Sequence, residues 1–132
     1  MDATEGRTIR TATLDQVLRT IRRRYSDPSL SLKVLSPGLN LSERHLGRLF
    51  KETLGQSFRH YLRELRIREA AALLANTTED VKMIAGKVGY SHQNHFGEDF
   101  RALMGCSALE FRNQEWPKSK GQILDRQFGE CY

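Results

Sequence analysis

Residues 58–75 read FRHYLRELRIREAAALLA, and their spaced apolar residues and central alanines predict one long helix. A copy of one short pattern stands on each side of this stretch. Residues 30–55 read LSLKVLSPGLNLSERHLGRLFKETLG, and residues 79–105 read EDVKMIAGKVGYSHQNHFGEDFRALMG. We therefore expect the helix to join two similar units and to set the distance between them.

The two copies align at a nearly constant offset. Leu35 pairs with Ile84 at 84 − 35 = 49, and Phe50 pairs with Phe100 at 100 − 50 = 50. The other pairs are Asn40 with Gly89 at 49, then Leu46 with Phe96, Gly55 with Gly105 and Tyr61 with Phe111 at 50. Because stable repeat arrays usually need about three copies, two copies predict a duplicated supersecondary motif.

Composition and charge narrow the class of protein. The 132 residues are 39% apolar, which suits one compact unit or two very small lobes. No apolar run approaches the roughly 18 residues of a membrane span and no signal peptide is visible, so we expect a soluble cytoplasmic protein. Residues 1–66 hold 13 Lys+Arg against 7 Asp+Glu, and residues 67–132 hold 8 against 9. The basic half indicates either contact with nucleic acid or an ordinary arginine-rich surface.

The apolar spacing predicts an all-α chain of seven helices without a strand. Residues 1–12 are polar and are expected to be frayed, and residues 114–132 are expected to form a loose tail. The first helix is expected to open at Thr13, which has capping-box spacing with Gln16. It ends before Pro28, because the residue before proline disfavours the helical region.

Each copy predicts a short helix, a tight turn and a longer helix. Pro37 keeps the first short helix, residues 31–36, short or bent, because proline removes a backbone donor. Ser42 is expected to cap the longer helix of the first copy and Ser91 that of the second. Glycines 55 and 105 end these helices, and a last helix over 107–113 packs Leu109 and Phe111 inward.

This order meets the packing demands of a helix-turn-helix. The motif needs a small residue where its helices touch, often a glycine at the turn, and a large apolar residue early in its second helix. The second copy supplies Ala85, Gly89 and Phe96, and the first supplies Ser36, Asn40 and Leu46. Two matches in register around one joining helix are much more specific than one.

The second helix of each copy has an outer face opposite its apolar positions. Rotation by 100° per residue places Arg44, Gly47, Arg48 and Lys51 on the first reading face and Asn94, Gly97, Glu98 and Arg101 on the second. Arginine suits guanine and asparagine suits adenine in the major groove, whereas Glu98 is repelled by phosphates and would accept from cytosine. The alternative is an ordinary solvated face.

Residues 30–112 resemble the DNA-binding domain of the AraC/XylS family of bacterial transcription regulators. The residues that carry the resemblance in the first copy and joining helix are Leu46, Arg48, Leu49, Phe50, Lys51, Gly55, Tyr61, Leu62, Arg66 and Ala70. Those in the second copy are Ile84, Ala85, Val88, Gly89, Tyr90, Ser91, Gln93, Phe96, Phe100, Gly105, Phe111 and Arg112. With the helix before it, the match covers about three quarters of the chain.

The resemblance implies seven helices, with both recognition helices in successive major-groove turns on one side of the duplex. It implies one DNA-binding domain over 13–113, with helix-turn-helix units over 31–55 and 79–105. By position, base contacts fall to Arg44, Gly47 and Arg48, then to Gln93, Asn94, Gly97 and Glu98. The chain departs from the family pattern at Pro37, Gly47, Gly97, Glu98 and Ala108.

Phosphate contacts supply most salt-dependent affinity in such a complex. The candidates are Lys33, Arg59, Arg63 and Lys82, with the backbone amides near Ser42 and Ser91. Arg63 and Arg66 could equally pair with Glu64, Glu69 or neighbouring carbonyls.

Other kinds of site find little support. His92 and His95 lie three apart but lack further ligands at a supporting spacing, and Cys106 and Cys131 are too few for a disulfide framework. No side chains form a recognisable catalytic arrangement, so we expect no enzyme, cofactor or metal.

Two functions remain open. One is a sequence-specific transcription regulator, for which the partners are double-stranded DNA and RNA polymerase. The other is a protein-interaction or anti-activator module whose second DNA reader is degenerate, which Glu98, Asp99 and the two glycines of the reading faces motivate. The chain has no room for a sensor domain, so we expect no small-molecule effector, and it is either a small stand-alone regulator or the C-terminal piece of a longer one.

Overall fold

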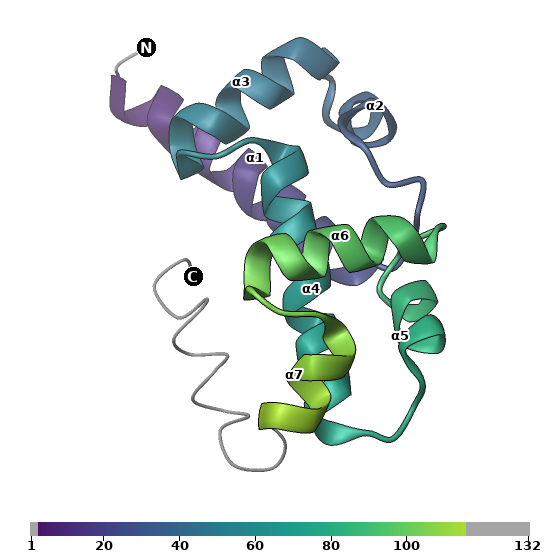
Figure 1. The fold of residues 1–132 in the computed structure, drawn as a ribbon. Helices are drawn as coiled ribbons and strands as arrows, with labels where there is room; N and C mark the ends of the chain where they lie inside the picture. The colour runs from purple at the N-terminus through teal and green to yellow at the C-terminus, as the bar shows by residue number, and fades with distance from the viewer. Residues whose placement is uncertain (1–2, 116–132) are drawn as a thin grey trace. The chain divides into compact units, whose positions relative to one another are not determined.

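The computed structural model describes residues 3–115, with side chains described for residues 12–113. Within this range the chain is all-α, with seven α-helices and no strand, as the sequence predicts (Figure 1). The helices are α1 Ala3–Arg24, α2 Leu32–Leu35, α3 Glu43–Leu54, α4 Phe58–Asn76, α5 Val81–Lys87, α6 Gln93–Met104 and α7 Ala108–Glu115, with a 3-10 helix η1 at Ser36–Leu39. The chain divides into two compact units at Leu62, inside α4.

Helix α1 begins at Ala3, so the expected start at Thr13 is wrong. Thr13 and Gln16 lie inside the helix and form no capping box there; instead the Thr20 hydroxyl donates to the Gln16 carbonyl at 2.9 Å. Residues 3–12 have no apolar stripe, so the apolar spacing did not indicate this part of the helix.

The first helix-turn-helix consists of α2, η1 and α3. The Ser31 side chain caps α2, and Pro37 stands at the start of η1, so the α-helix ends at Leu35 as the proline predicts. Asn40 adopts a left-handed conformation with φ 56°, which asparagine tolerates better than most residues. Ser42 caps α3 as expected, because its hydroxyl accepts from the His45 amide at 3.0 Å.

The core of the first unit forms where α1, α3 and the start of α4 bury apolar residues. Ile21, Leu46 and Phe50 are fully buried. The Phe50 ring makes edge contacts with Phe58 and Tyr61, at centroid distances of 5.8 and 5.5 Å. These contacts fix α3, so that its opposite face is left for solvent.

The second unit repeats the motif with α5 and α6 and adds α7. Asp80 caps α5, and Gly89 takes φ 103° at the turn. The residue that caps α6 is His92, without a side-chain hydrogen bond, so the expected cap at Ser91 is wrong. The residue inserted after the turn in this copy puts the cap one position later than the first copy suggests.

A chain of aromatic rings fills the second core. The centroids of Phe96 and Phe100 lie 5.7 Å apart, as do those of Phe100 and Phe111. Leu109 is 58% exposed, so its expected inward position is wrong, and Ala108 is buried instead. The residues Ser107 and Glu110 form a capping box that starts α7 at Ala108. Positions 108 and 111 lie on one face of this helix, so Leu109 faces outward when Phe111 is buried.

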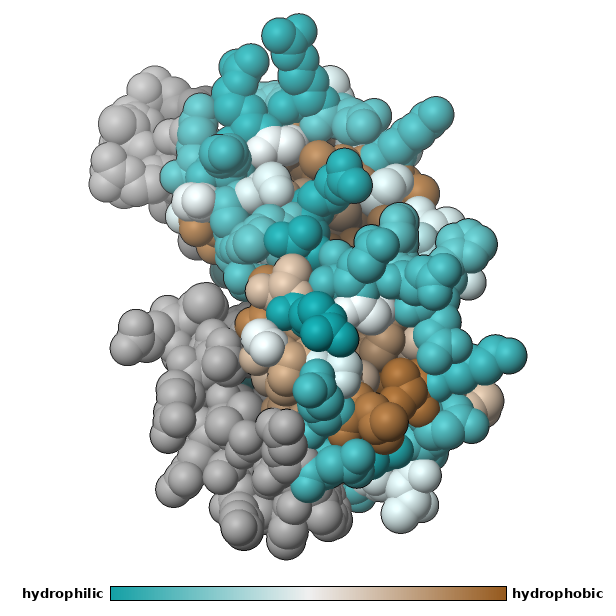
Figure 2. Space-filling model, viewed as in Figure 1, coloured by the Kyte–Doolittle hydropathy of each residue, from teal (hydrophilic) through white to brown (hydrophobic). Residues whose placement is uncertain are grey.

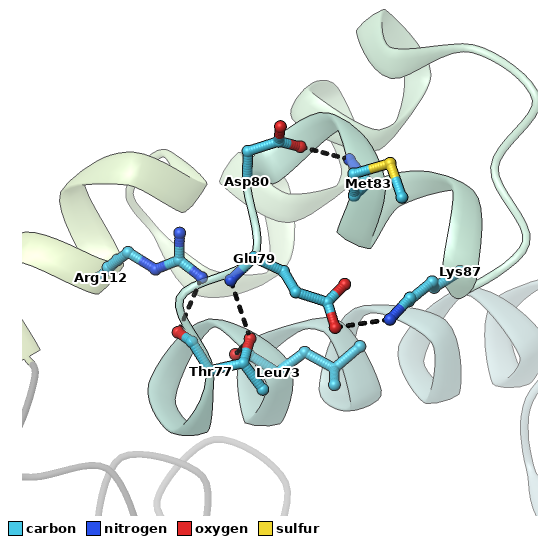
Figure 3. A network of polar contacts seen from close by, with 7 residues as sticks. All are labelled: Leu73, Thr77, Glu79, Asp80, Met83, Lys87 and Arg112. Atoms are coloured by element: carbon cyan, nitrogen blue, oxygen red, sulfur yellow. Dashed lines mark hydrogen bonds and ion pairs between the residues drawn. The ribbon is translucent and has the colours of Figure 1, made fainter.

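The end of α4 is held by polar contacts from α7 (Figure 3). The Arg112 guanidinium donates to the Leu74 carbonyl at 3.2 Å and to the Thr77 carbonyl at 3.1 Å. The Thr77 hydroxyl donates to the Leu73 carbonyl at 2.7 Å, and Lys87 bonds to Glu79 nearby. The bond to Leu74 gives a partner to one of the last carbonyls of α4, which a helix end leaves without a partner within the helix.

Candidate DNA interface

The first reading face is cationic and open. Arg44, Arg48 and Lys51 on α3 are all exposed, and none forms an ion pair or hydrogen bond with another side chain that the structure describes. Helix α3 holds them in place because its buried side, with Leu46, fixes its rotation. Three unpaired cations on one helix face suit an anionic partner.

Gly47 faces the neighbouring helix more than solvent. A Cβ atom at this position would lie 3.2 Å from Leu32 Cδ1 on α2. The missing side chain therefore lets α2 pack closely against α3. The resemblance to the family assigns a base contact to Gly47, whereas in the structure this glycine lies against Leu32.

The second reading face is exposed but electrically mixed. Asn94, Gly97, Glu98 and Arg101 are exposed on α6, and so is Gln93 at its first position. A Cβ atom at Gly97 would meet nothing within 4 Å, unlike one at Gly47. The face carries one acid and one base where the first carries three cations.

Asp99 turns away from the second reading face. It is half-buried, and its carboxylate accepts a hydrogen bond from the Tyr90 hydroxyl at 2.8 Å. Its other oxygen lies 3.9 Å from Arg63 Nη1, and the Arg66 guanidinium lies over the Tyr90 ring, 5.8 Å from the centroid. Asp99, one of the two acids that make α6 less cationic than α3, thus contacts other side chains of the protein and does not lie on the reading face.

Burial raises the pKa of Tyr90, and the hydrogen bond to Asp99 raises it further. Tyr90 therefore stays protonated and remains a hydrogen-bond donor at any physiological pH. Its ring also contacts Phe96 edge-on, with the centroids 5.4 Å apart. The turn before α6 is held by both ends of this side chain.

Comparison with known proteins assigns the family. A family model described as a helix-turn-helix domain matches residues 35–114. The chain is 39% identical over 67 residues to the HTH-type transcriptional activator RhaR of Mannheimia succiniciproducens, covering 51% of this chain and 24% of RhaR. A crystal structure of a Chromobacterium violaceum transcriptional regulator, of the AraC-type DNA-binding domain-containing proteins, matches at TM-score 0.73 and 27% identity, over 82% of this chain and 96% of that one.

The chain belongs to the AraC-type helix-turn-helix family. The DNA-binding domain of AdpA, solved in complex with a target DNA, shares the fold at TM-score 0.72 and 22% identity, over 76% of this chain and 89% of that one. The matched residues cover about a quarter of the length of RhaR, which is a transcriptional activator. The family resemblance read from the residues is thereby confirmed.

The candidate phosphate contacts of this AraC-type domain differ in exposure and in their contacts within the protein. Lys33, Arg59 and Lys82 are exposed, whereas Arg63 is engaged by Asp99. Ser42 uses its hydroxyl as a helix cap, and Ser91 is exposed one residue before the cap of α6. The backbone amides at the start of α3 and α6 remain the groups that a phosphate could approach.

Apolar surface is limited among the described residues. Hydrophilic residues cover most of the face drawn in Figure 2, with smaller brown areas between them. The large apolar side chains that are exposed are Val34, Met83 and Leu109. Nor does any described helix combine the length and the apolar character that crossing a bilayer requires.

The sequence singled out two histidines and two cysteines as candidate ligands or redox partners. His92 and His95 are both exposed, and within residues 12–113 no group of three or more histidine, cysteine or acidic side chains could hold a metal ion. Cys106 is half-buried, and Cys131 lies outside the described residues, so their pairing is untested.

The sequence analysis missed the role of Asp99 and the bonds of Arg112 to α4. A signal for Asp99 was present, since 99 − 50 = 49 aligns it with the buried Leu49 and therefore with the inner side of its helix. Arg112 had no such signal, because its carbonyl partners lie 38 and 35 residues earlier in the chain.

Proposed function

We propose that this chain is a sequence-specific double-stranded DNA-binding transcription regulator in which α3 and α6 enter successive major-groove turns. The observation that carries the proposal is the first reading face, where Arg44, Arg48 and Lys51 are exposed and lack acidic partners among the described residues. An α-helix fits the major groove, and arginine there binds guanine O6 and N7. Membership of the AraC-type family supports the same function.

The two readers have different base preferences in this proposal. On α3, Arg44 and Arg48 bind guanines and Lys51 adds a third cation, while Gly47 contributes only its backbone. On α6, Gln93 and Asn94 suit adenine, Glu98 accepts from cytosine N4, and Arg101 suits guanine. Gly97 has open space around it, which gives the α6 backbone room to approach the groove. The first half-site is therefore rich in guanine and the second is mixed.

Phosphate contacts orient the domain on the duplex without reading sequence. We assign them to the exposed side chains Lys33, Arg59 and Lys82 and to the first-turn amides beside Ser42 and Ser91. A helix N-terminus attracts anions through its unsatisfied N–H groups. Arg63 was a candidate too, but Asp99 engages it.

The structure explains two of the four residues that suggested the protein-interaction alternative. Asp99 faces inward to Tyr90 and Arg63, and Gly47 admits Leu32, so neither residue needs the loss of DNA binding to explain it. Only Glu98 and Gly97 remain, and both are compatible with a major-groove reader. The DNA-binding function is therefore the one that the described contacts support best.

Selection from randomised duplex DNA tests this function. The chain would be incubated with the library at about physiological salt, where nonspecific binding is weak. We expect two enriched half-sites about 10 base pairs apart. A single short half-site would limit reading to α3, and no enrichment by a folded protein would refute the proposal.

The wider partners are inferred from relatives of which the matched residues cover only a part, 24% in RhaR. RhaR is a transcriptional activator, so we infer that this domain acts near RNA polymerase at a promoter. We infer further that no small-molecule effector binds within residues 13–113. Equilibrium dialysis with the purified chain against candidate inducers would overturn the second inference if any of them bound.

A further inference from the structure

One carboxylate connects three elements of the second unit. Asp99 lies on α6, Tyr90 in the turn before α6, and Arg63 on α4. The Tyr90 hydroxyl donates to Asp99 at 2.8 Å, and Arg63 Nη1 lies 3.9 Å from the second oxygen. We call these three residues the Asp99 cluster. The hydrogen bond and the ion pair thus link one side chain of α6 to the turn before it and to α4.

The first helix-turn-helix has apolar residues at the same repeat positions. Asp99 aligns with Leu49 at 99 − 49 = 50, and Tyr90 aligns with Leu41 at 90 − 41 = 49. Leu49 is 4% exposed. Apolar contacts hold a helix without preferred direction, whereas a hydrogen bond weakens steeply when its angle changes. The second reader therefore has a directional restraint where the first has a non-directional one.

Small rotations of a reading helix matter. Side-chain tips lie roughly 5–6 Å from a helix axis, so a turn of about 20° moves them by roughly 2 Å. The donor–acceptor distance of a good hydrogen bond varies by only about 0.5 Å. A recognition helix that rotates by this amount loses its bidentate base contacts, although it remains folded and in the groove.

We propose that Asp99 is a positioning residue of the second reader, which acts through Tyr90 and Arg63 to fix the rotation of α6 and thus the direction of Asn94, Glu98 and Arg101. The inference rests on the proposed DNA-binding function. It assigns Arg63 to this internal cluster and not to a phosphate. Asp99 itself touches no base.

The test uses isosteric variants and measures base discrimination. Tyr90→Phe removes the hydroxyl, and Asp99→Asn removes the charge that faces Arg63. Each variant is titrated with the selected duplex, with the second half-site scrambled, and with the first half-site scrambled. We expect discrimination at the second half-site to fall about two- to tenfold, the range of one lost hydrogen bond, while discrimination at the first is unchanged.

A matched control and a double variant separate positioning from charge and stability. Asp15→Asn removes an exposed carboxylate from α1 and should leave both discriminations as in the wild type. The double variant of Tyr90 and Asp99 should lose less than the sum of the single losses, because the two act as one unit. Unchanged discrimination, or an equal loss at both half-sites together with a lower melting temperature, would overturn the proposal.

Arg63→Gln distinguishes the two roles open to that residue. If Arg63 belongs to the Asp99 cluster, the variant loses discrimination at the second half-site and keeps the wild-type salt dependence. If Arg63 contacts a phosphate, affinity falls for all sequences and the slope of log K against log salt changes by about 0.9. The second result would overturn the assignment.

A measurement without DNA tests the role of Asp99 independently of the proposed DNA-binding function. Amide hydrogen exchange is measured along α6 and α3 in the wild type and in Tyr90→Phe. We expect faster exchange in α6 and unchanged exchange in α3, whether or not the chain selects a DNA site. A wild type that selects no DNA would refute the proposed function alone, whereas unchanged exchange in α6 would overturn the role of Asp99.

Discussion

Arg48 illustrates what a single side chain decides in this domain. It is exposed on α3, and no described residue forms an ion pair with it. The guanidinium of Arg48 therefore keeps its N–H donors available for a partner. It can donate two parallel hydrogen bonds to a partner with paired acceptors, as guanine has in O6 and N7.

We expect Arg48→Ala to weaken binding to the selected site by about 1–3 kcal/mol and to relax base preference at one position. Titrations with single-base variants of the site provide the measurement. Arg19→Ala, which removes an exposed arginine from α1, is the control and should leave base preference unchanged. If Arg48→Ala weakened every sequence alike, the residue would be a phosphate contact and not a reader.

Gly47 and Gly97 occupy equivalent positions with different surroundings. Substitution of each by alanine should therefore change the stability of the protein by different amounts. Gly97→Ala adds a methyl group in open space and should stabilise the protein by about 0.5–1 kcal/mol, because glycine inside a helix is entropically costly. Gly47→Ala brings the new methyl to 3.2 Å from Leu32 Cδ1, so its gain should be smaller or reversed. Urea unfolding measures both, and equal gains would contradict the packing role of Gly47.

At the scale of elements, the sequence correctly predicted the boundaries that a glycine or a proline sets. Gly55 and Gly105 end α3 and α6 with positive φ, and Pro37 ends α2, because each residue restricts its own backbone. The start of α1 was wrong because residues 3–12 have no apolar stripe and therefore leave no periodic signal. The inward position of Leu109 was wrong because positions 109 and 111 lie about 200° apart on a helix, and Phe111 is the one that is buried.

Part of the candidate site was predictable, because helix geometry alone decides which residues of a helix share a face. Helical periodicity places residues such as Arg44 and Arg48 outward once the buried positions are known. It cannot tell that Gly47 meets Leu32 or that Asp99 meets Arg63, since those contacts depend on how two elements pack. Tertiary partners at large sequence separation leave no mark on local spacing.

The capping box of α7 gives the domain a measurable response to acid. Hydrogen bonds from the Ser107 amide and hydroxyl lower the pKa of Glu110 from its ordinary value of 4.5. A lowered carboxyl pKa contributes stability above the unfolded-state pKa, and this contribution is lost as pH falls through the folded-state pKa. We expect Glu110→Gln, which keeps an acceptor at this position, to lack that increment of acid destabilisation.

Urea unfolding of both proteins between about pH 7 and pH 3 measures this difference. The gap in stability should be largest at neutral pH and should close below the ordinary pKa of the carboxyl. Glu52→Gln, an exposed substitution on α3, is the control and should keep the wild-type loss in acid. A gap that persists at the lowest pH would mean that glutamine weakens the box for reasons other than charge.

At the scale of the whole molecule, α4 is the element that both compact units share. It runs without interruption from Phe58 to Asn76, and the boundary between the units falls inside it at Leu62. In the proposed complex α3 and α6 enter successive major-groove turns, so their half-sites must lie about one helical turn of the duplex apart. We therefore expect binding to depend strictly on that spacing.

Inserting about 5 base pairs between the selected half-sites rotates the second by about half a turn of the duplex. We expect affinity to fall to that of a duplex with the second half-site scrambled, because α6 then has no groove to enter when α3 is bound. The same insertion placed outside the site is the control and should leave affinity unchanged. If the inserted duplex bound as well as the original, the two readers would act as separate modules, and the proposed binding in successive major-groove turns would be refuted.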